Sequence, residues 1–551
     1  MTKPPIRTST RPLKTTAPAP RWVPLLLGVL ALIGATAHII YMRVMFDDAY
    51  ITYRYAKNLA HGMGLVFNPG ERVEGYSNFL WTLMMSVVVL AGGRPEDVGP
   101  VLSALIALAT LVLVMGFAQR RGRIGWLAGL MLAASSCWVT WATGGLETAL
   151  FGGLLTLGVI GLLRALERRH PVDLRWLHAS AIGFGLACLT RPDGPLLAVC
   201  AVIAVAVLVV RGHLRLTDAM SWMMLLILLA LPHVIWRYNY YGRLVPNTFA
   251  VKPPGATRLV FGAHYLATAA RDLWLWLLLV PVALLALLRA RPRGLSRIDV
   301  TLTAAVVLPF LAYLATTGGD FMPVFRFVAP LLPLVTLVAV MAFAGLVDAL
   351  RPQRLAWLGV IIGAVTVAAY VTLNLTHSMK QQDIWSEGEL VSVGWARQEV
   401  DDWLRIGDLL AKVAAPTDTL ATTAAGAVPY RAGLYTIDML GLTAPDLKHY
   451  RRLPNNRPGH MILLDEQTID AHPPQLLLAH PMVKPDAGHL GLSYAMRPEW
   501  NDRVMSHYTL VGLTLPGQPA RYVGVAVRND CTARIMAAGD AAATAGATAT
   551  P

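Results

Sequence analysis

The sequence predicts a polytopic α-helical membrane protein of about eleven spans, followed by a C-terminal α/β domain outside the membrane. Of the 551 residues, 55% are hydrophobic and only 15% are charged, whereas soluble domains carry about 25% charged residues. Long apolar runs recur between residues 21 and 374, as expected for helices that cross a bilayer. After residue 374 amphipathic and alternating patterns replace these runs, which indicates a water-exposed domain.

Four segments follow from these patterns. Residues 1–20 are rich in Pro, Thr, Lys and Arg and predict a disordered, cytoplasmic N-terminus. Residues 21–374 form the membrane module, and its first outer loop covers residues 43–98. Residues 375–535 form the extracytoplasmic domain. Residues 536–551, rich in Ala and Thr, predict a disordered tail.

The positive charge of the loops indicates which apolar runs of the membrane module cross the bilayer. The run 22–42 is too long for the core of a signal peptide and predicts an uncleaved first span. The run 79–91 is short, and if it crossed, the Arg-rich loop 119–123 would fall outside. We therefore expect it to lie along the outer face. The remaining spans are expected at 99–118, 124–141, 146–163, 176–190, 195–210, 219–236, 272–288, 299–317, 327–348 and 355–374.

This arrangement separates two kinds of loop. Ordinary Arg-rich loops fall on the cytoplasmic side, and loops with unusual polar residues fall outside. The formal charge of +14 is explained by the cytoplasmic loops, so no nucleic-acid partner is expected. The span interiors hold almost no ionisable residues, which a transporter or proton pump usually needs. The site is therefore expected at the outer surface.

Two adjacent carboxylates, Asp47 and Asp48, lie just beyond the outer end of the first span. Helical spacing would place Asp47, Tyr50 and Arg54 on one face. The pair is thus a candidate proton acceptor beside a cation able to hold a phosphate. The alternative is a capped surface helix, because an Asp at a helix start is stabilised by the helix dipole.

The other outer loops supply further candidates. Arginine donates paired, charge-assisted hydrogen bonds to phosphate. The candidate phosphate ligands are Arg54, Arg191, Lys252 and Arg326. The candidate substrate-binding residues are Tyr50, Glu74, Tyr76, Asn78, Glu147, Asp193, Asn247 and Asp320. The four cysteines show no zinc-site spacing. We expect no metal and no other cofactor, although a divalent cation stays open.

The sequence after the last span predicts a domain that contains both helices and strands. Residues 389–413 have the pattern of an amphipathic helix, and residues 418–422 and 461–464 have that of short strands. Its role stays open between a structural lid and the guidance of an acceptor.

Several segments of the sequence are similar to those of a known protein family. They are DDAYITYRYA at 47–56, GLVFN at 64–68 and VEGYSNFLW at 73–81, with the turns at 145–148, 191–194, 246–249 and 319–321 and the segments 426–430 and 436–442. Together they resemble the mycobacterial terminal β-(1→2)-arabinofuranosyltransferases and their bacterial relatives. The resemblance runs from about residue 20 to residue 530, and the first-loop motif is its most specific part.

The resemblance implies a GT-C glycosyltransferase of the bacterial inner membrane. It implies a polyprenyl-phosphate sugar donor, a cell-envelope glycan or glycolipid acceptor and a catalytic acid in the first outer loop. That acid falls on the Asp47–Asp48 pair, and Asp47 is favoured as the first of the two. The implied sugar is arabinofuranose, with other sugars left open.

The chemistry of such a donor is consistent with these residues. Polyprenyl phosphate is a good leaving group, so the enzyme has to activate an acceptor hydroxyl and stabilise the departing phosphate. Asp47 would act as general base in an inverting displacement, or as nucleophile if configuration is retained. A flippase or transporter of lipid-linked sugars and a non-catalytic envelope assembly protein are the alternatives.

Overall fold

The structure is a computed structural model. It describes residues 22–122, 124–167, 171–251, 256–289, 295–351, 355–383, 391–453, 461–486, 488, 490–492, 502, 506–515 and 521–548. The expected N-terminal segment 1–20 and the candidate Lys252 lie outside these residues.

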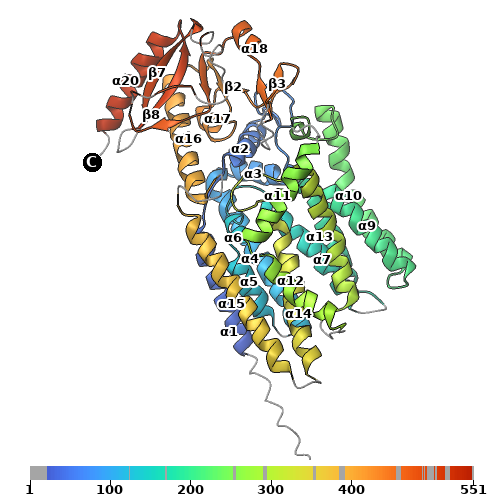
Figure 1. Ribbon diagram of the computed structural model, residues 1–551. Helices are drawn as coiled ribbons and strands as arrows, with labels where there is room; N and C mark the ends of the chain where they lie inside the picture. The colour runs from blue at the N-terminus through green and yellow to red at the C-terminus, as the bar shows by residue number, and fades with distance from the viewer. Residues whose placement is uncertain are drawn as a thin grey trace, which may run out of the picture.

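A bundle of long helices forms one end of the molecule and a sheet domain forms the other (Figure 1). Within the described residues, seven helices are long and apolar enough to cross a membrane. They are α1 (Trp22–Tyr41), α4 (Pro95–Gly122), α7 (Thr148–Ala165), α10 (Leu216–Tyr241), α13 (Arg297–Thr317), α14 (Leu332–Leu350) with the η2 turn (Ala329–Leu331) before it, and α15 (Ala356–Lys380). The chain is therefore a multi-pass membrane protein, as expected.

Shorter helices occupy the remaining expected spans. They are α5 (Gly125–Ala134), α6 (Ser136–Thr140), α8 (Leu174–Thr190), α9 (Gly194–Val210) and α12 (Trp276–Leu287). Helix α11 (Ala256–Asp272) instead lies between the expected spans 219–236 and 272–288, in a segment expected to be an outer loop. Helices α11 and α12 are bent by 86° and add at most an eighth span by length and composition. The expected span 124–141 is broken at Ser135, whose extended backbone and hydroxyl cap the start of α6. Among the described residues, the break at Ser135 and the 17-residue lengths of α8 and α9 together leave fewer than eleven helices long enough to count as single spans.

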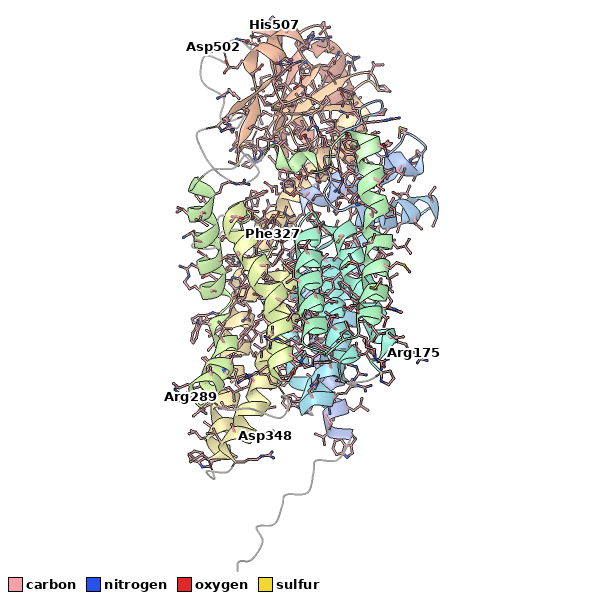
Figure 2. All side chains as sticks on the ribbon, turned by 90° about the vertical axis from the view of Figure 1, so that its right-hand side faces the viewer. Arg175, Arg289, Phe327, Asp348, Asp502 and His507 are labelled. Atoms are coloured by element: carbon pink, nitrogen blue, oxygen red, sulfur yellow. The ribbon has the colours of Figure 1, made fainter. Side chains whose placement is uncertain are left out.

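The two kinds of loop separate to opposite ends of the bundle. Figure 2 shows Arg175 and Arg289 at the end opposite the sheet domain. At that end Arg121 forms ion pairs with Glu167 and Asp299, at 3.3 Å each. The ends of α4 and α7 and the start of α13 therefore meet there. We call this the Arg-rich end.

Two short helices lie at the other end of the bundle, next to the sheet domain (Figure 1). Helix α2 (Asp47–Ala60) follows α1 directly, and α3 (Phe79–Leu90) has only 12 residues. Val87 and Leu90 of α3 are largely exposed, which fits a short apolar helix at a membrane surface better than a span.

The C-terminal domain has the expected α/β architecture. Helix α16 (Val393–Val413) precedes a sheet of strand order β2-β1-β5-β8-β6, and β7 pairs with β8. The strands are β1 (Thr419–Thr422), β2 (Tyr435–Asp438), β5 (Leu476–Ala479), β6 (Val483–Lys484), β7 (Tyr508–Leu515) and β8 (Arg521–Arg528). A separate pair joins β3 (Tyr450–Arg452) to β4 (Ile462–Leu464), and the short helices are α17 (Ala427–Ala432) and α18 (Glu466–Ala471).

The parallel strands of this sheet have their carboxyl ends at one edge. Strand β1 runs parallel to both β2 and β5, with Thr422 opposite Asp438 and Ala479. The carboxyl ends of these three strands therefore meet at one edge of the sheet. In open α/β sheets this edge is where ligands usually bind.

The tail differs from the expectation of disorder. Helix α20 (Thr532–Thr548) includes most of the residues expected to be disordered. Alanine has the highest helix propensity, and the buried Ile535 belongs to the apolar core of the domain. The tail therefore continues as a helix to Thr548, and its residues Ala538 and Ala542 pack against the apolar core.

Candidate functional site

A cavity of about 520 Å³ lies where the bundle meets the sheet domain. Figure 2 shows Phe327, one of its lining residues, at the end of the bundle nearest that domain. Most of the predicted residues line it: Asp47, Asp48, Tyr76, Asn78, Glu147, Arg191, Asp193, Asp320 and Arg326. These come from loops that are far apart in sequence, so the fold brings the outer loops together as expected.

Asp47 joins the cavity to the C-terminal domain. One of its carboxylate oxygens accepts a hydrogen bond from the backbone N–H of Ala427 at 2.6 Å, and the other accepts one from Gly426 at 3.1 Å. The pKa of Asp47 is raised to about 7, chiefly by burial; the negative charges of Asp48 and Asp438 contribute to this rise, and the two N–H groups oppose it. The result is an oriented carboxylate that is more basic than an exposed one.

Asp48 faces the cationic side of the cavity. Its carboxylate lies 3.7 Å from the guanidinium of Arg326, which also forms an ion pair with Asp320 at 2.8 Å. The Asp48 side chain is 37% exposed, whereas that of Asp320 is 5% exposed. Asp320 therefore anchors Arg326, and Asp48 lies toward the open space.

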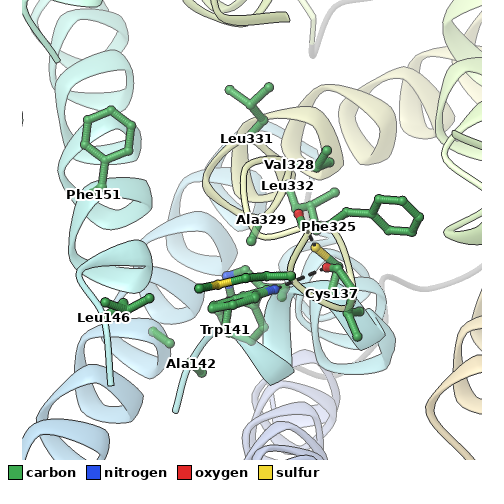
Figure 3. Close-up of a cluster of buried hydrophobic side chains, with 14 of the residues drawn as sticks. Cys137, Trp141, Ala142, Leu146, Phe151, Phe325, Val328, Ala329, Leu331 and Leu332 are labelled. Atoms are coloured by element: carbon green, nitrogen blue, oxygen red, sulfur yellow. Dashed lines mark hydrogen bonds between the residues drawn. The ribbon is translucent and has the colours of Figure 1, made fainter. Parts of the chain in front are cut away.

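The loop that carries Arg326 is held in a strained conformation. Val324 and Phe325 both have positive φ values, 55° and 53°, which is uncommon for any non-glycine residue and costly for a β-branched one. Trp141 Nε1 donates to the Val324 carbonyl at 3.2 Å, and Cys137 Sγ donates to that of Phe325 at 3.5 Å. Figure 3 shows both side chains directed at this loop from a buried apolar cluster. The cluster thus fixes the backbone immediately before Arg326.

A second group of ion pairs forms another part of the cavity wall. Arg191 binds Glu147 at 2.8 Å and Asp193 at 2.9 Å. The second oxygen of Glu147 accepts a hydrogen bond from Asn78 at 2.8 Å. Both carboxylates contact Arg191 closely and are buried, whereas the second partner of Arg326, Asp48, lies 3.7 Å away and is 37% exposed. Arg191 is therefore a weaker candidate for the donor phosphate than Arg326.

Arg54 does not reach the cavity. Its guanidinium donates to the carbonyls of Phe67, Pro429 and Leu434 at 2.7–2.9 Å. It also donates to Asn68 Oδ1 and Thr436 Oγ1. Burial lowers its pKa to about 10. Arg54 therefore fastens the first outer loop to the C-terminal domain.

Three more predicted residues also lie outside the cavity lining. Tyr50 is buried against the rings of Tyr53 and Tyr430. Glu74 forms an ion pair with Arg237 at 3.0 Å. Asn247 donates to the carbonyls of Gly441, Leu442 and Ala444. Asn247 thus joins the outer loop after α10 to the C-terminal domain, as Arg54 does for the first loop.

The C-terminal domain supplies lining residues that the sequence did not identify. Trp395, Glu399 and Trp403 lie four residues apart on α16 and line the cavity from one helix face. Thr423, Asp438 and His480 line it from the carboxyl ends of β1, β2 and β5. The amphipathic pattern of residues 389–413 predicted helix α16. It did not show which surface the helix packs against, so these lining residues were not identified.

The bundle adds Arg258 and Tyr313 to the lining. Among the described residues, no group of three or more His, Cys, Asp or Glu is arranged to hold a metal ion.

Comparisons with known proteins agree with this architecture. Residues 100–386, just over half of the chain, match the Alg9-like mannosyltransferase family. Residues 389–534 match a domain of unknown function, DUF8728. The chain is 31% identical over 342 residues to a terminal β-(1→2)-arabinofuranosyltransferase of Mycobacterium tuberculosis, covering 54% of this chain and 52% of the relative. It is 30% identical over 318 residues to the protein of the same name from Corynebacterium glutamicum, covering 50% and 45%. The chain thus spans about half the length of these relatives.

Solved structures share the fold at lower identity. ArnT from Cupriavidus metallidurans bound to undecaprenyl phosphate matches with a TM-score of 0.54 and 15% identity, over 92% of this chain and 98% of that one. Its apo form matches with a TM-score of 0.54 and 14% identity, over 92% and 97%. The chain therefore has the GT-C fold and belongs to the Alg9-like mannosyltransferase family.

Proposed function

We propose that this protein transfers a sugar from a polyprenyl-phosphate donor to a cell-envelope glycan at the non-cytoplasmic face of the bacterial inner membrane. One observation carries the proposal. A single cavity holds the Asp47–Asp48 pair and Arg326 where membrane helices meet a folded domain. A lipid-linked donor and a water-soluble acceptor can meet only at such a boundary.

We assign the donor phosphate to Arg326 and Arg258, two guanidinium groups that line the cavity. Planar guanidinium groups stabilise the charge that develops on a departing phosphate. Arg326 is held for this role by Asp320 beneath it and by the fixed loop before it. The solved ArnT with bound undecaprenyl phosphate supports a polyprenyl carrier in this fold.

Asp47 is the favoured general base. Its pKa of about 7 leaves a large fraction ionised near neutral pH while keeping the carboxylate basic, which suits proton abstraction. The backbone N–H groups of Gly426 and Ala427 fix its orientation. If the reaction retains configuration, the same carboxylate would act as the nucleophile.

We assign the acceptor to the lining residues that α16 contributes. Trp395 and Trp403 offer aromatic surfaces and Glu399 offers a carboxylate along one face of α16. Aromatic rings and carboxylates together suit a sugar, which has apolar C–H faces and polar hydroxyl edges. The names of the two arabinofuranosyltransferase relatives support arabinofuranose as the first sugar to test.

The test is release of polyprenyl phosphate from labelled donors that carry arabinofuranose, mannose or glucose, using the purified full-length chain in detergent with an envelope glycan acceptor. We expect one donor to be cleaved with transfer of its label to the acceptor. Movement of intact donor across a vesicle membrane without cleavage would identify a flippase. Absence of both cleavage and movement with every donor would favour an assembly protein.

A further inference from the structure

A second cavity of about 650 Å³ lies between α9 and α13 and shares no lining residue with the candidate site. Its walls are apolar and come from both helices. They are formed by Cys200, Ile203, Ala204, Val207 and Leu208 of α9 and by Ile298, Thr301, Leu302, Ala305 and Pro309 of α13. We call it the α9–α13 groove.

The groove lies on the lipid-facing side of the bundle. Val199 and Ile203 of α9 are 56% and 59% exposed, and Leu308 of α13 is 62% exposed. Apolar side chains so exposed on membrane helices contact acyl chains. The groove is therefore accessible to a lipid from the bilayer and not to a water-soluble ligand.

Its length corresponds to one leaflet. On α13 the lining runs from Arg297 to Pro309, which is about 18 Å at a rise of about 1.5 Å per residue. The hydrocarbon core is about 30 Å thick, so the groove covers roughly one half of it. This length matches one acyl chain of a glycerophospholipid and is too short for a long polyprenyl chain in extended form.

Cations lie at one end of the groove only. Arg211 and His213 follow α9, and Arg297 begins α13. Among the ion pairs between described residues, none involves Arg211 or Arg297, whereas Arg121 and Arg351 at the same end of the bundle are paired with carboxylates. The groove thus combines apolar walls with a positive mouth at the headgroup level of the Arg-rich end.

We propose that the α9–α13 groove binds an anionic glycerophospholipid from the leaflet at the Arg-rich end. One acyl chain fills the space between α9 and α13, and the headgroup phosphate contacts Arg211 and Arg297. The site is independent of the sugar-transfer cavity and requires no assumption about the reaction.

Native mass spectrometry of the full-length protein tests this proposal, with phosphatidylglycerol and phosphatidylcholine of identical acyl chains added in parallel. We expect one retained phosphatidylglycerol and much weaker retention of phosphatidylcholine. Arg211→Gln with Arg297→Gln should reduce phosphatidylglycerol retention about tenfold or more. Each arginine near an anionic headgroup strengthens lipid binding by electrostatic attraction, and the double variant removes two of them. Ala305→Leu, which narrows the apolar wall, should reduce retention while leaving both arginines in place.

The matched control is Arg175→Gln with Arg351→Gln, two cations at the same end that do not line the groove. This control should retain phosphatidylglycerol like the wild type. Equal loss in both arginine pairs would overturn the proposal, as would equal retention of the two lipids or unchanged binding in Ala305→Leu. Stoichiometric displacement of phosphatidylglycerol by polyprenyl phosphate would assign the groove to a different lipid and also overturn it.

Discussion

Arg54 is buried and the side chain of Arg326 is 11% exposed, and their different partners indicate different roles. Arg54 donates to backbone carbonyls and polar side chains of two separate chain segments and is 6% exposed. Arg326 is held by Asp320 and lies 3.7 Å from Asp48 at the cavity. A guanidinium saturated by carbonyls stabilises a fold, whereas one bound by carboxylates at a cavity wall can exchange a partner for phosphate.

Replacing Arg54 should therefore affect stability first. Arg54→Met leaves the carbonyls of Pro429 and Leu434 without this donor and should destabilise the protein by about 2–4 kcal/mol. Thermal unfolding of the purified protein measures the effect. Lys57→Met is the matched control, because Lys57 lies on the same helix and is exposed. Equal melting temperatures for the two variants would contradict the assignment of Arg54 as a link between loop and domain.

The raised pKa of Asp47 makes the reaction depend on pH. A general base must be deprotonated, so kcat/KM should fall about tenfold per pH unit below about pH 7. Because the charge of Asp48 contributes to raising the pKa of Asp47, Asp48→Asn should move this acid limb to lower pH. The pH profile of donor cleavage measures both effects. A limb that stays in place or moves to higher pH in Asp48→Asn would exclude Asp47 as the titrating group.

Among the elements, the turn before α17 places the C-terminal domain against the first outer loop, at Asp47. Gly426 and Ala427 donate to Asp47, and a Cβ atom on Gly426 would lie 2.0 Å from the Asp47 carbonyl oxygen. A side chain cannot enter this contact without moving the carboxylate. The domain thus takes part in the site itself and does not act only as a cover.

Gly426→Ala tests this contact. We expect the variant to fold and to lose at least about tenfold in kcat, because a shift of about 1 Å at a reacting group can cost about a hundredfold. Gly116→Ala is the control, since a Cβ there meets nothing within 4 Å and alanine favours a helix. Steady-state donor cleavage measures both variants. Wild-type turnover by Gly426→Ala would show that the contact does not position Asp47.

At the scale of the whole molecule, the sequence predicted what depends on local pattern and missed what depends on packing between distant segments. Apolar runs and loop charge located the helices and separated the two ends of the bundle. They also led to the polar loops that line the cavity, including Asp48, Glu147 and Arg326. The break at Ser135 was not visible, because a run of apolar residues does not show where its helix bends. Helix α11 was also missed, because its residues lie between two expected spans, in a segment expected to be a loop.

The functions of individual residues were less predictable for the same reason. Arg54 and Asn247 have partners more than 190 residues away in the sequence, so their spacing could not distinguish a ligand from a structural contact. The cavity-facing side of α16 and the strand ends at Asp438 and His480 depend on how the sheet docks on the bundle. Helix α20 was missed because composition alone does not reveal a packing partner.

The central claim is that a carboxylate shared by the membrane module and the C-terminal domain performs the chemistry, and Asp47→Asn tests it most directly. The measurement is the rate of polyprenyl phosphate release from labelled donor by purified wild type and variant, with a melting curve to confirm folding. Loss of a general base should lower the rate about 10²–10⁴-fold. The melting temperature should fall only modestly, because asparagine keeps one of the two oxygens that accept from the N–H groups of Gly426 and Ala427. Near-normal release by a folded Asp47→Asn variant would contradict the account.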